Sequence, residues 1–303
     1  MELDTGIAAV LGGVLGLLVG SFLNVVIHRL PKMMERQWAA DCAAMVPEAA
    51  AGAATGPASP ATATSTSTAA PATADPPRFN LMTPASRCPQ CGHAIRWWEN
   101  IPVFSYMALR GRCAGCRTRI SVRYPLVELA TGAAFAWCLG RWGVTPAGAV
   151  WCGFAAALIA LALIDWDTTL LPDDITLPLL WGGLLAAALQ WNAIGLADAV
   201  WGAAAGYVSL WAVYWAFKLA TGKEGMGHGD FKLFAALGAW FGWSALIPII
   251  LMASTIGAVI GIAMKFRSAL REGGYIPFGP FLAGAGLTAM LFGPNAILRA
   301  IGL

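Results

Sequence analysis

The chain has 303 residues, of which 58% are hydrophobic and only 12% are charged, and its mean hydropathy is +0.66. A soluble globular domain carries roughly 25% charged residues, so this composition excludes that class and indicates a membrane protein. The formal net charge of +3 is too small to indicate nucleic acid as a partner.

Eight apolar runs approach or exceed the roughly 20 residues that a helix needs to cross a bilayer. These runs are 6–28, 125–143, 146–165, 175–192, 196–218, 231–243, 245–265 and 279–301. Phe241-Gly242-Trp243, after the short sixth run, is either a tight turn or a kink in one long helix. We therefore predict an all-α polytopic membrane protein with about eight transmembrane helices in the lipid bilayer.

The positive charges predict the orientation of the chain, because cytoplasmic loops collect lysine and arginine. With eight spans and the N-terminus outside, 17 of the 19 basic residues fall on the cytoplasmic side. Only Arg141 and Arg299 then remain outside. In this orientation Asp165 and Asp230 both lie at the cytoplasmic ends of their helices.

We divide the chain into a first transmembrane helix (1–30), a cytoplasmic segment (31–124) and a membrane-embedded domain (125–303). Pro31 makes continuation of the first helix costly, so we expect that helix to close there.

The cytoplasmic segment contains two different parts. Residues 43–77 are rich in Ala, Thr, Pro and Ser, a composition that buries too little apolar surface to order itself, so we predict a disordered linker. Residues 80–123 are predicted to form a small basic module inserted after the first helix. The aromatic residues available as its core are Trp97, Trp98, Phe104 and Tyr106.

Four of the seven cysteines form two C-x-x-C pairs, namely Cys88, Cys91, Cys113 and Cys116. Their spacing is close to that of a zinc ribbon. In a reducing cytosol such pairs are more often metal ligands than disulfides. Four thiolates saturate a tetrahedral Zn²⁺ ion and leave no open position, so we predict a structural zinc site. A redox pair is the alternative interpretation.

Two acids, Asp165 and Asp230, each lie at the end of a separate apolar run. Two neighbouring carboxyl groups cannot both ionise easily, so one keeps its proton near neutral pH. The ionised group can then take a proton from water while its partner donates one to a scissile carbonyl. We predict that these acids form the catalytic dyad of an intramembrane aspartyl protease. The alternative is that each acid only faces the headgroup region.

Three glycines precede Asp230 in Gly225-Met226-Gly227-His228-Gly229. They remove side chains where a backbone could approach closely, and we expect Gly227 and Gly229 to contact an extended substrate. The run matches neither G-x-G-x-x-G nor a P-loop and does not follow a strand, so it does not indicate a phosphate site.

Other polar groups near the two acids have simpler explanations. Asp167 would point some 200° away from Asp165 on a continuing helix. Asp173 and Asp174 follow Pro172 and are expected as the N-cap and first-turn acids of the next helix. His228 has no second histidine nearby to share a ligand role.

Taken together, these motifs resemble the type IV prepilin leader peptidases, which are bifunctional with an N-methyltransferase activity. The resemblance covers most of the chain and rests on the joint occurrence of several segments. These segments are Gly20-Ser21-Phe22-Leu23-Asn24-Val25-Val26-Ile27, the tetracysteine module with Glu99-Asn100-Ile101-Pro102, Arg123-Tyr124-Pro125-Leu126-Val127-Glu128, Asp165 with Leu171-Pro172-Asp173, and Gly227-His228-Gly229-Asp230.

The resemblance implies a bacterial inner-membrane enzyme whose active site faces the cytoplasm. It implies Asp165 and Asp230 as the catalytic pair, and prepilins or pseudopilins with short basic leaders as substrates. It also implies methylation of the new N-terminus with S-adenosylmethionine as methyl donor. The client system, a pilus or type II secretion, stays open, as does the question of whether the chain forms a homodimer.

Two alternatives from other functional classes remain open. A proton-coupled transporter would use the same acids as a relay, but it predicts acids nearer the middle of the membrane and paired broken helices. A non-catalytic assembly scaffold would use the cysteine module for docking.

Overall fold

The computed structural model describes residues 4–45, 79–266 and 276–301. The predicted linker 43–77 therefore lies outside the described residues, apart from its first three positions, which are helical. The described part of the chain is helical and contains no strand, only two isolated antiparallel bridges. This confirms the all-α prediction.

The helices follow one another as α1 (Thr5–Met45), α2 (Phe104–Ala108), α3 (Arg123–Trp142), α4 (Pro146–Thr168), α5 (Asp173–Ala188), α6 (Leu196–Thr221), α7 (His228–Phe241), α8 (Leu246–Phe266), α9 (Gly279–Phe292) and α10 (Pro294–Ile301). Two 3₁₀ helices, η2 (Trp97–Asn100) and η3 (Trp243–Ala245), join them. Four segments of the described chain are long and apolar enough to cross a membrane: α1, α4, α6 and the continuous stretch from η3 through α8. Helix α9 is a shorter apolar helix.

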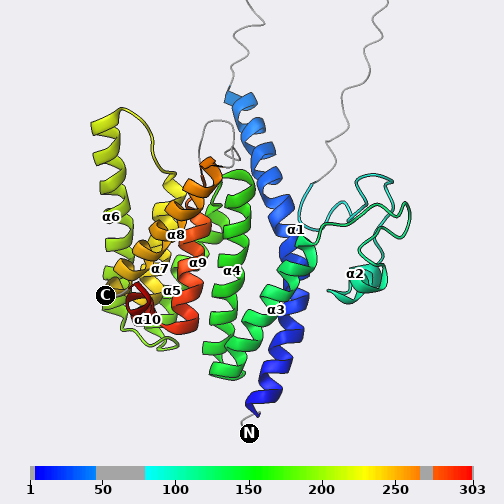
Figure 1. Ribbon diagram of the computed structural model, residues 1–303, viewed down its shortest axis with the longest axis horizontal. Coiled ribbons are helices and arrows are strands. Elements are labelled where there is room, and N and C mark those ends of the chain that lie inside the picture. Colours follow the sequence, from blue (N-terminus) through cyan, green and yellow to red (C-terminus); the bar gives the residue numbers. More distant parts are fainter. Residues whose placement is uncertain (1–3, 46–78, 267–275, 302–303) are drawn as a thin grey trace, which may run out of the picture.

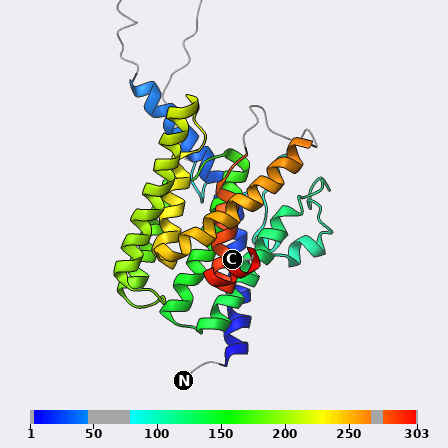
Figure 2. The ribbon, with the colours of Figure 1, turned by 60° about the vertical axis from the view of Figure 1, so that its left-hand side comes forward.

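Helix α1 does not close at Pro31, so that expectation was wrong. The helix continues for 41 residues to Met45, with Pro31 buried inside it, and it is the longest element in both views (Figures 1 and 2). A proline removes one backbone hydrogen bond and costs a helix about 3 kcal/mol. Here the packing of Pro31 and of the neighbouring buried Arg29 offsets that cost.

Small residues set the distance between α1 and α3. Gly12, Gly16 and Gly20 recur every fourth residue, so they lie along one face of α1. A Cβ atom added to Gly16 would lie 2.6 Å from the carbonyl oxygen of Thr131, and one added to Gly20 would lie 2.7 Å from Cα of Glu128. This is the close backbone approach that small-xxx-small patterns allow between membrane helices.

Helix α7 forms the centre of the other half of the molecule. It is apolar on all sides, as expected of a helix with neighbours all round, and it packs against α5, α6, α8 and α9. Gly202 of α6 and Gly238 of α7 face each other so closely that a Cβ atom on either would overlap the backbone of the other. The indole of Trp240 donates a hydrogen bond of 2.8 Å to the carbonyl of Leu179, which satisfies its only buried polar atom.

Two helix boundaries in the C-terminal half bear on the predicted apolar runs: one decides between the two alternatives at Phe241-Gly242-Trp243, and the other divides the last run. Helix α7 ends at Phe241, and Gly242 at φ 80° turns the chain, so α7 and α8 are separate helices rather than one kinked helix. The last run, 279–301, is divided into α9 and α10 where Gly293, at φ 82°, precedes Pro294. A left-handed glycine followed by proline ends a helix because neither residue favours its continuation.

The cysteine module lies beside α1 and α3 (Figure 1). Its aromatic residues do not form a core, which contradicts the expectation from sequence: Trp97 is 77% exposed and Phe104 is 69% exposed. A module of this size is ordered by its cysteines and by bonds to α1 and α3, so the aromatic rings stay on its surface.

Candidate functional site

The first predicted acid, Asp165, lies in the last turn of α4. Its side chain is buried, with a relative exposure of 5%. The helix ends because Thr169 adopts a left-handed conformation at φ 57°, and the Thr169 N–H donates to the carbonyl of Asp165 at 2.8 Å. The chain then continues through Leu171 and the buried Pro172, which is the N-cap residue of α5.

The second predicted acid, Asp230, lies in the first turn of α7. It is 6% exposed, and its carboxyl group accepts a hydrogen bond from the backbone of Gly227, the N-cap residue. Its Oδ1 atom is buried and has no hydrogen-bond partner among the described residues. One carboxyl oxygen of Asp230 therefore accepts a hydrogen bond at the start of α7, while Oδ1 has no hydrogen-bond partner among the described residues.

The two acids approach each other across the ends of three helices. The two carboxyl groups are close enough for the charge of Asp165 to act on Asp230. Leu171 lies against the backbone beside each of them. A Cβ atom on Gly229 would lie 2.6 Å from Cβ of Leu171, and one on Gly279, at the start of α9, would lie 3.2 Å from Cδ1 of the same leucine. The structure thus gathers the end of α4 and the starts of α7 and α9 into one site.

Gly279 was not among the site residues predicted from the sequence. A Cβ atom at this position would lie 2.5 Å from Oδ2 of Asp165, so only glycine leaves room for the carboxylate where it lies. The signal was present in Pro277-Phe278-Gly279-Pro280, where a glycine between prolines opens an apolar run. Such a glycine marks a close approach of the backbone to another group.

The two predicted substrate glycines have different surroundings. Gly227 has open space around it: among the described residues, Oδ2 of Asp230, at 3.8 Å, is the one atom within 4 Å of a Cβ placed there. The space beside Gly229 is filled by Leu171. Bulk at position 227 would therefore meet the acid, while bulk at position 229 would first displace Leu171.

The loop that leads into α7 is fixed to the end of α6. Lys218 donates to Glu224 at 2.9 Å, and the buried Tyr214 donates to the same Glu224 oxygen at 3.3 Å. The hydrogen bond from Lys218 lowers the pKa of Glu224. His228 packs its ring against Tyr214 and Phe231, and this packing accounts for the histidine as part of the same loop anchor.

Two other acids near Asp165, Asp167 and Asp173, form ion pairs. Asp167 pairs with Arg123 at 2.7 Å, a contact that joins the end of α4 to the start of α3. Asp173 pairs with Lys232 of α7 at 2.7 Å. Asp173 and Asp174 both lie in the first turn of α5, whose N-cap is Pro172 rather than Asp173.

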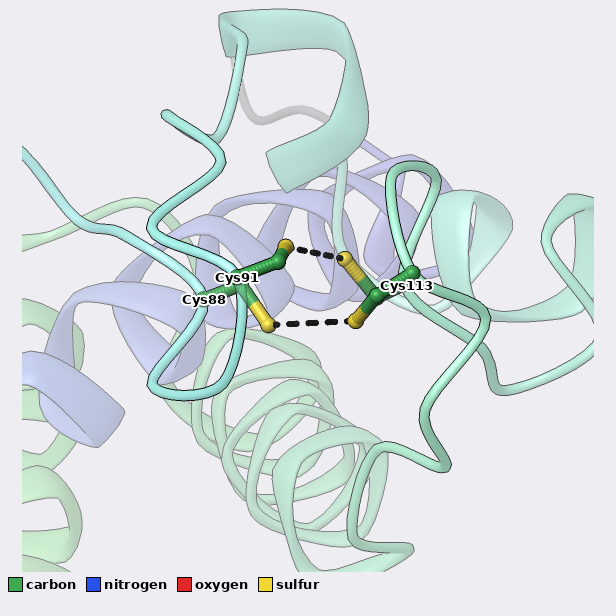
Figure 3. Close-up of side chains that lie close together, drawn as sticks. Cys88, Cys91 and Cys113 are labelled. Carbon is green, nitrogen blue, oxygen red and sulfur yellow. Dashed lines mark hydrogen bonds between the residues drawn. The ribbon is translucent and has the colours of Figure 1, made fainter.

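The four cysteines lie close together, and Figure 3 shows the side chains of Cys88, Cys91 and Cys113 within this cluster. Their sulfur atoms are within 4.8 Å of one another, with Cys88 Sγ 3.8 Å from Cys116 Sγ and Cys91 Sγ 3.9 Å from Cys113 Sγ. A tetrahedral zinc ion with Zn–S bonds of about 2.3 Å requires sulfurs about 3.8 Å apart. The four thiols therefore fit a metal ion, and hydrogen bonding with Thr118 lowers the pKa of Cys116 to about 6.

Each C-x-x-C pair lies in a turn of the same design. In the first turn Cys88 N–H donates to His93 O and Gly92 N–H donates to Cys88 O. In the second turn Cys113 N–H donates to Thr118 O and Arg117 N–H donates to Cys113 O. The residue at the tip has a positive φ in both turns, 70° for Gly92 and 58° for Arg117.

Two buried polar side chains fix the module to the membrane helices. Arg29 of α1 donates to the carbonyls of Asn80 at 3.0 Å and Pro84 at 2.7 Å. Glu128 of α3 accepts a bond of 2.8 Å from the backbone N–H of Val103. The fold and these features define an all-helical membrane protein with two buried carboxyl groups at one end of its bundle and a four-cysteine module beside it.

Comparison with known proteins agrees with this class of membrane protein and identifies a family within it. Residues 14–142 match the bacterial peptidase A24 N-terminal domain, and residues 152–262 match the type IV leader peptidase family. The prepilin leader peptidase/N-methyltransferase of Burkholderia pseudomallei is 49% identical over 96% of this chain and 87% of its own length. The proteins of the same name from Stutzerimonas stutzeri and Pseudomonas aeruginosa are each 49% identical over 92% of this chain, and over 89% and 88% of their own lengths.

The chain belongs to the type IV prepilin leader peptidase/N-methyltransferase family. No solved structure gives a significant match to the chain.

Proposed function

We propose that the chain cleaves the leader peptide of type IV prepilins or pseudopilins at the cytoplasmic face of the bacterial inner membrane. It then methylates the new N-terminal residue. The names and high identity of the relatives support this activity. The observation that carries the chemistry is the pair of buried acids, Asp165 and Asp230, at the converging ends of α4 and α7.

In the proposed peptidase reaction the two acids act on one water molecule. The ionised carboxylate takes a proton from the water as its oxygen attacks the scissile carbonyl, and the protonated partner donates a proton to the carbonyl oxygen. When the C–N bond breaks, the leaving nitrogen receives a proton from the site, so no covalent enzyme intermediate forms. Gly227 and Gly229 would border the path of the substrate backbone to Asp230.

Methylation would use S-adenosylmethionine, which supplies a methyl group to the free amino group released by cleavage. The family resemblance supports this step. In the described residues we assign no side chain to the methyl donor.

The proposed topology has eight spans with the N-terminus outside, so that Asp165 and Asp230 face the cytoplasm. The domain division follows from it: a first transmembrane span (1–30), which is the membrane part of α1, a cytoplasmic segment (31–124) with linker 43–77, and a peptidase domain (125–303). Helices α5, α7 and α9 are short for spans, but each packs against longer helices: α5 against α4 and α6, α7 against α6 and α8, and α9 against α4 and α8. The terminal-turn positions of both acids favour a protease over a transporter with a relay in mid-membrane.

The metal in the module is proposed to be a structural Zn²⁺ ion. The cysteines Cys88, Cys91, Cys113 and Cys116 would be its four ligands, and the sulfur separations support tetrahedral coordination. Such a site has no open position, so zinc would hold the module together and take no part in peptide hydrolysis.

The test is prepilin cleavage by the purified full-length chain in detergent. Asp165→Asn and Asp230→Asn should each abolish cleavage, because a neutral amide supplies neither the base nor the acid. Asp167→Asn is the matched control: it lies two residues from Asp165 on the same helix end, pairs with Arg123 and should retain most activity. Zinc content and elution volume check that each variant is folded. Near wild-type cleavage by either of the first two variants would rule out the dyad.

A further inference from the structure

Part of the module presents an apolar surface that no described residue covers. Five side chains of η2, α2 and their connection form this aromatic face: Trp97, Trp98, Ile101, Phe104 and Met107. Trp97, Phe104 and Met107 are 77%, 69% and 68% exposed. Trp97 and Trp98 are in ring contact, with centroids 5.5 Å apart. Large exposed apolar side chains gathered in so short a stretch indicate an interaction site, because soluble surfaces seldom leave large rings together in water.

The bond between Val103 and Glu128 fixes the depth of this face. Glu128 lies five positions after Arg123, the first residue of α3, which is about 7.5 Å along the helix axis. Because Val103 donates to Glu128 at 2.8 Å, the start of α2 lies beside the second turn of α3 and not beyond its end. Figure 1 shows α2 alongside the helix pair α1 and α3. If α3 spans the membrane, the aromatic face lies at the depth of the lipid headgroups.

The charge of the module indicates which surface it can meet. Between Phe79 and Arg123 the chain has seven arginines, of which Arg123 pairs with Asp167, and one acidic residue, Glu99. Glu99 is engaged with His93 at 3.0 Å, whereas Arg96 stacks on Trp98 of the aromatic face, 5.2 Å from the ring centroid. This surface attracts anionic lipid and repels the basic leader of a prepilin.

We infer that the aromatic face is seated in the headgroup region of the bilayer, with the arginines of the module on anionic lipid. Tryptophan and other amphipathic side chains prefer this zone, and interfacial elements bury their apolar face about 5–10 Å into the headgroup boundary. The inference rests on the proposed topology, in which α1 and α3 cross the membrane. The cysteine module is then a membrane-lying element and not a free cytosolic domain.

The full-length protein in lipid nanodiscs tests this placement. A genetically encoded fluorescent amino acid replaces Phe104 in one variant and Ala114 in a second. Ala114 is the matched control, since it is exposed and belongs to the same module but lies in the second cysteine turn. Lipids with a nitroxide near the headgroup quench a reporter in the interface, and iodide quenches a reporter in water. The nanodiscs contain either phosphatidylcholine alone or phosphatidylcholine with phosphatidylglycerol.

We expect nitroxide lipid to quench the reporter at position 104 about threefold more than the reporter at position 114, because only the former lies in the interface. Iodide should give the reverse order, and phosphatidylglycerol should enlarge the difference. Adding Trp97→Ser and Met107→Ser should reduce quenching at position 104 by nitroxide lipid.

Equal quenching at the two positions would overturn the inference. So would shielding of position 104 that develops only when prepilin is added, because the face would then bind substrate. An unchanged difference without phosphatidylglycerol would overturn the role of the arginines. Cleavage is measured on the same preparations: cleavage without lipid contact overturns only this inference, and lipid contact without cleavage overturns only the proposed function.

Discussion

The cysteine module and the centre of the helical bundle are ordered in opposite ways. Between Phe79 and Arg123 the buried residues are Pro102, Gly111 and Cys113 alone, whereas every residue of α7 from Leu233 to Trp240 is buried. The module relies on a few directional contacts, namely the sulfur cluster and the bonds to Arg29 and Glu128. The bundle relies on many undirected contacts at close range. We therefore expect that removing one of these contacts disorders the whole module, whereas a substitution in the bundle alters only the packing around the substituted residue.

The largest effect is expected from removing the metal ligands. Cys88→Ser with Cys91→Ser should abolish zinc binding, since two of four thiolates are lost. In small zinc modules metal binding supplies most of the folding free energy, so the module should become sensitive to protease. Elemental analysis and limited proteolysis measure both effects. Cys42→Ser is the control, because Cys42 is exposed on α1 and is not one of the four clustered cysteines.

This outcome also tests the comparison itself. The bundle should keep its melting behaviour in the double variant, because no residue of the cysteine turns belongs to the buried hydrophobic clusters of the described chain. A freshly purified, reduced protein without zinc would contradict the metal assignment. Loss of the whole fold in the double variant would contradict the independence of the two regions.

A smaller and more local effect is expected in the bundle at Gly279. Gly279→Ala places a methyl group against Asp165 Oδ2, which must move the carboxylate or α9. A shift of about 1 Å at a reacting group costs on the order of 10²-fold in rate, so prepilin cleavage should fall by about that factor while the protein stays folded. Gly284→Ala is the matched control in the same helix, because a Cβ atom there meets nothing within 4 Å. Equal activity of the two variants would show that the packing at Gly279 does not position Asp165.

The smallest effect distinguishes the two cysteine turns from each other. Gly92 and Arg117 occupy equivalent tips with positive φ, a conformation that strains any residue with a Cβ atom by about 1 kcal/mol. Arg117→Gly should remove this strain and slow the loss of zinc to a chelator several-fold. The reciprocal change, Gly92→Ala, should accelerate it. Identical rates in both variants would mean that the tips carry no strain.

The sequence predicted the parts of this fold that depend on local chemistry. The apolar runs gave the helices, the two C-x-x-C motifs gave the sulfur cluster, and the switch from acid to apolar residues placed Asp165 and Asp230 in terminal turns. Their assignment as a catalytic dyad stays a prediction. Periodicity, spacing and ligand chemistry are properties of a short stretch of chain, so they can be interpreted without the tertiary structure.

The parts that depend on distant contacts were predicted poorly. Pro31 was expected to end α1, but its cost is offset by packing and by the neighbouring Arg29, which binds carbonyls some fifty residues further along the chain. The module aromatics were expected inside, yet nothing in their local pattern distinguishes a core from a surface that contacts lipid or another partner. Gly279 was missed because its importance lies in its distance to Asp165.

The unbroken length of α1 has a consequence for the connectivity of the chain. The polypeptide leaves α1 at Met45, and it is next described at Phe79, whose ring lies under Arg36 of the same helix at 4.0 Å. From Arg36 to Met45 is about 13.5 Å along the axis, a gap that about five extended residues can bridge. The two points at which the described chain stops and resumes therefore lie along one helix, so the number of residues between them is uncoupled from the placement of everything on either side. A change in that number would leave the registry of the site unchanged.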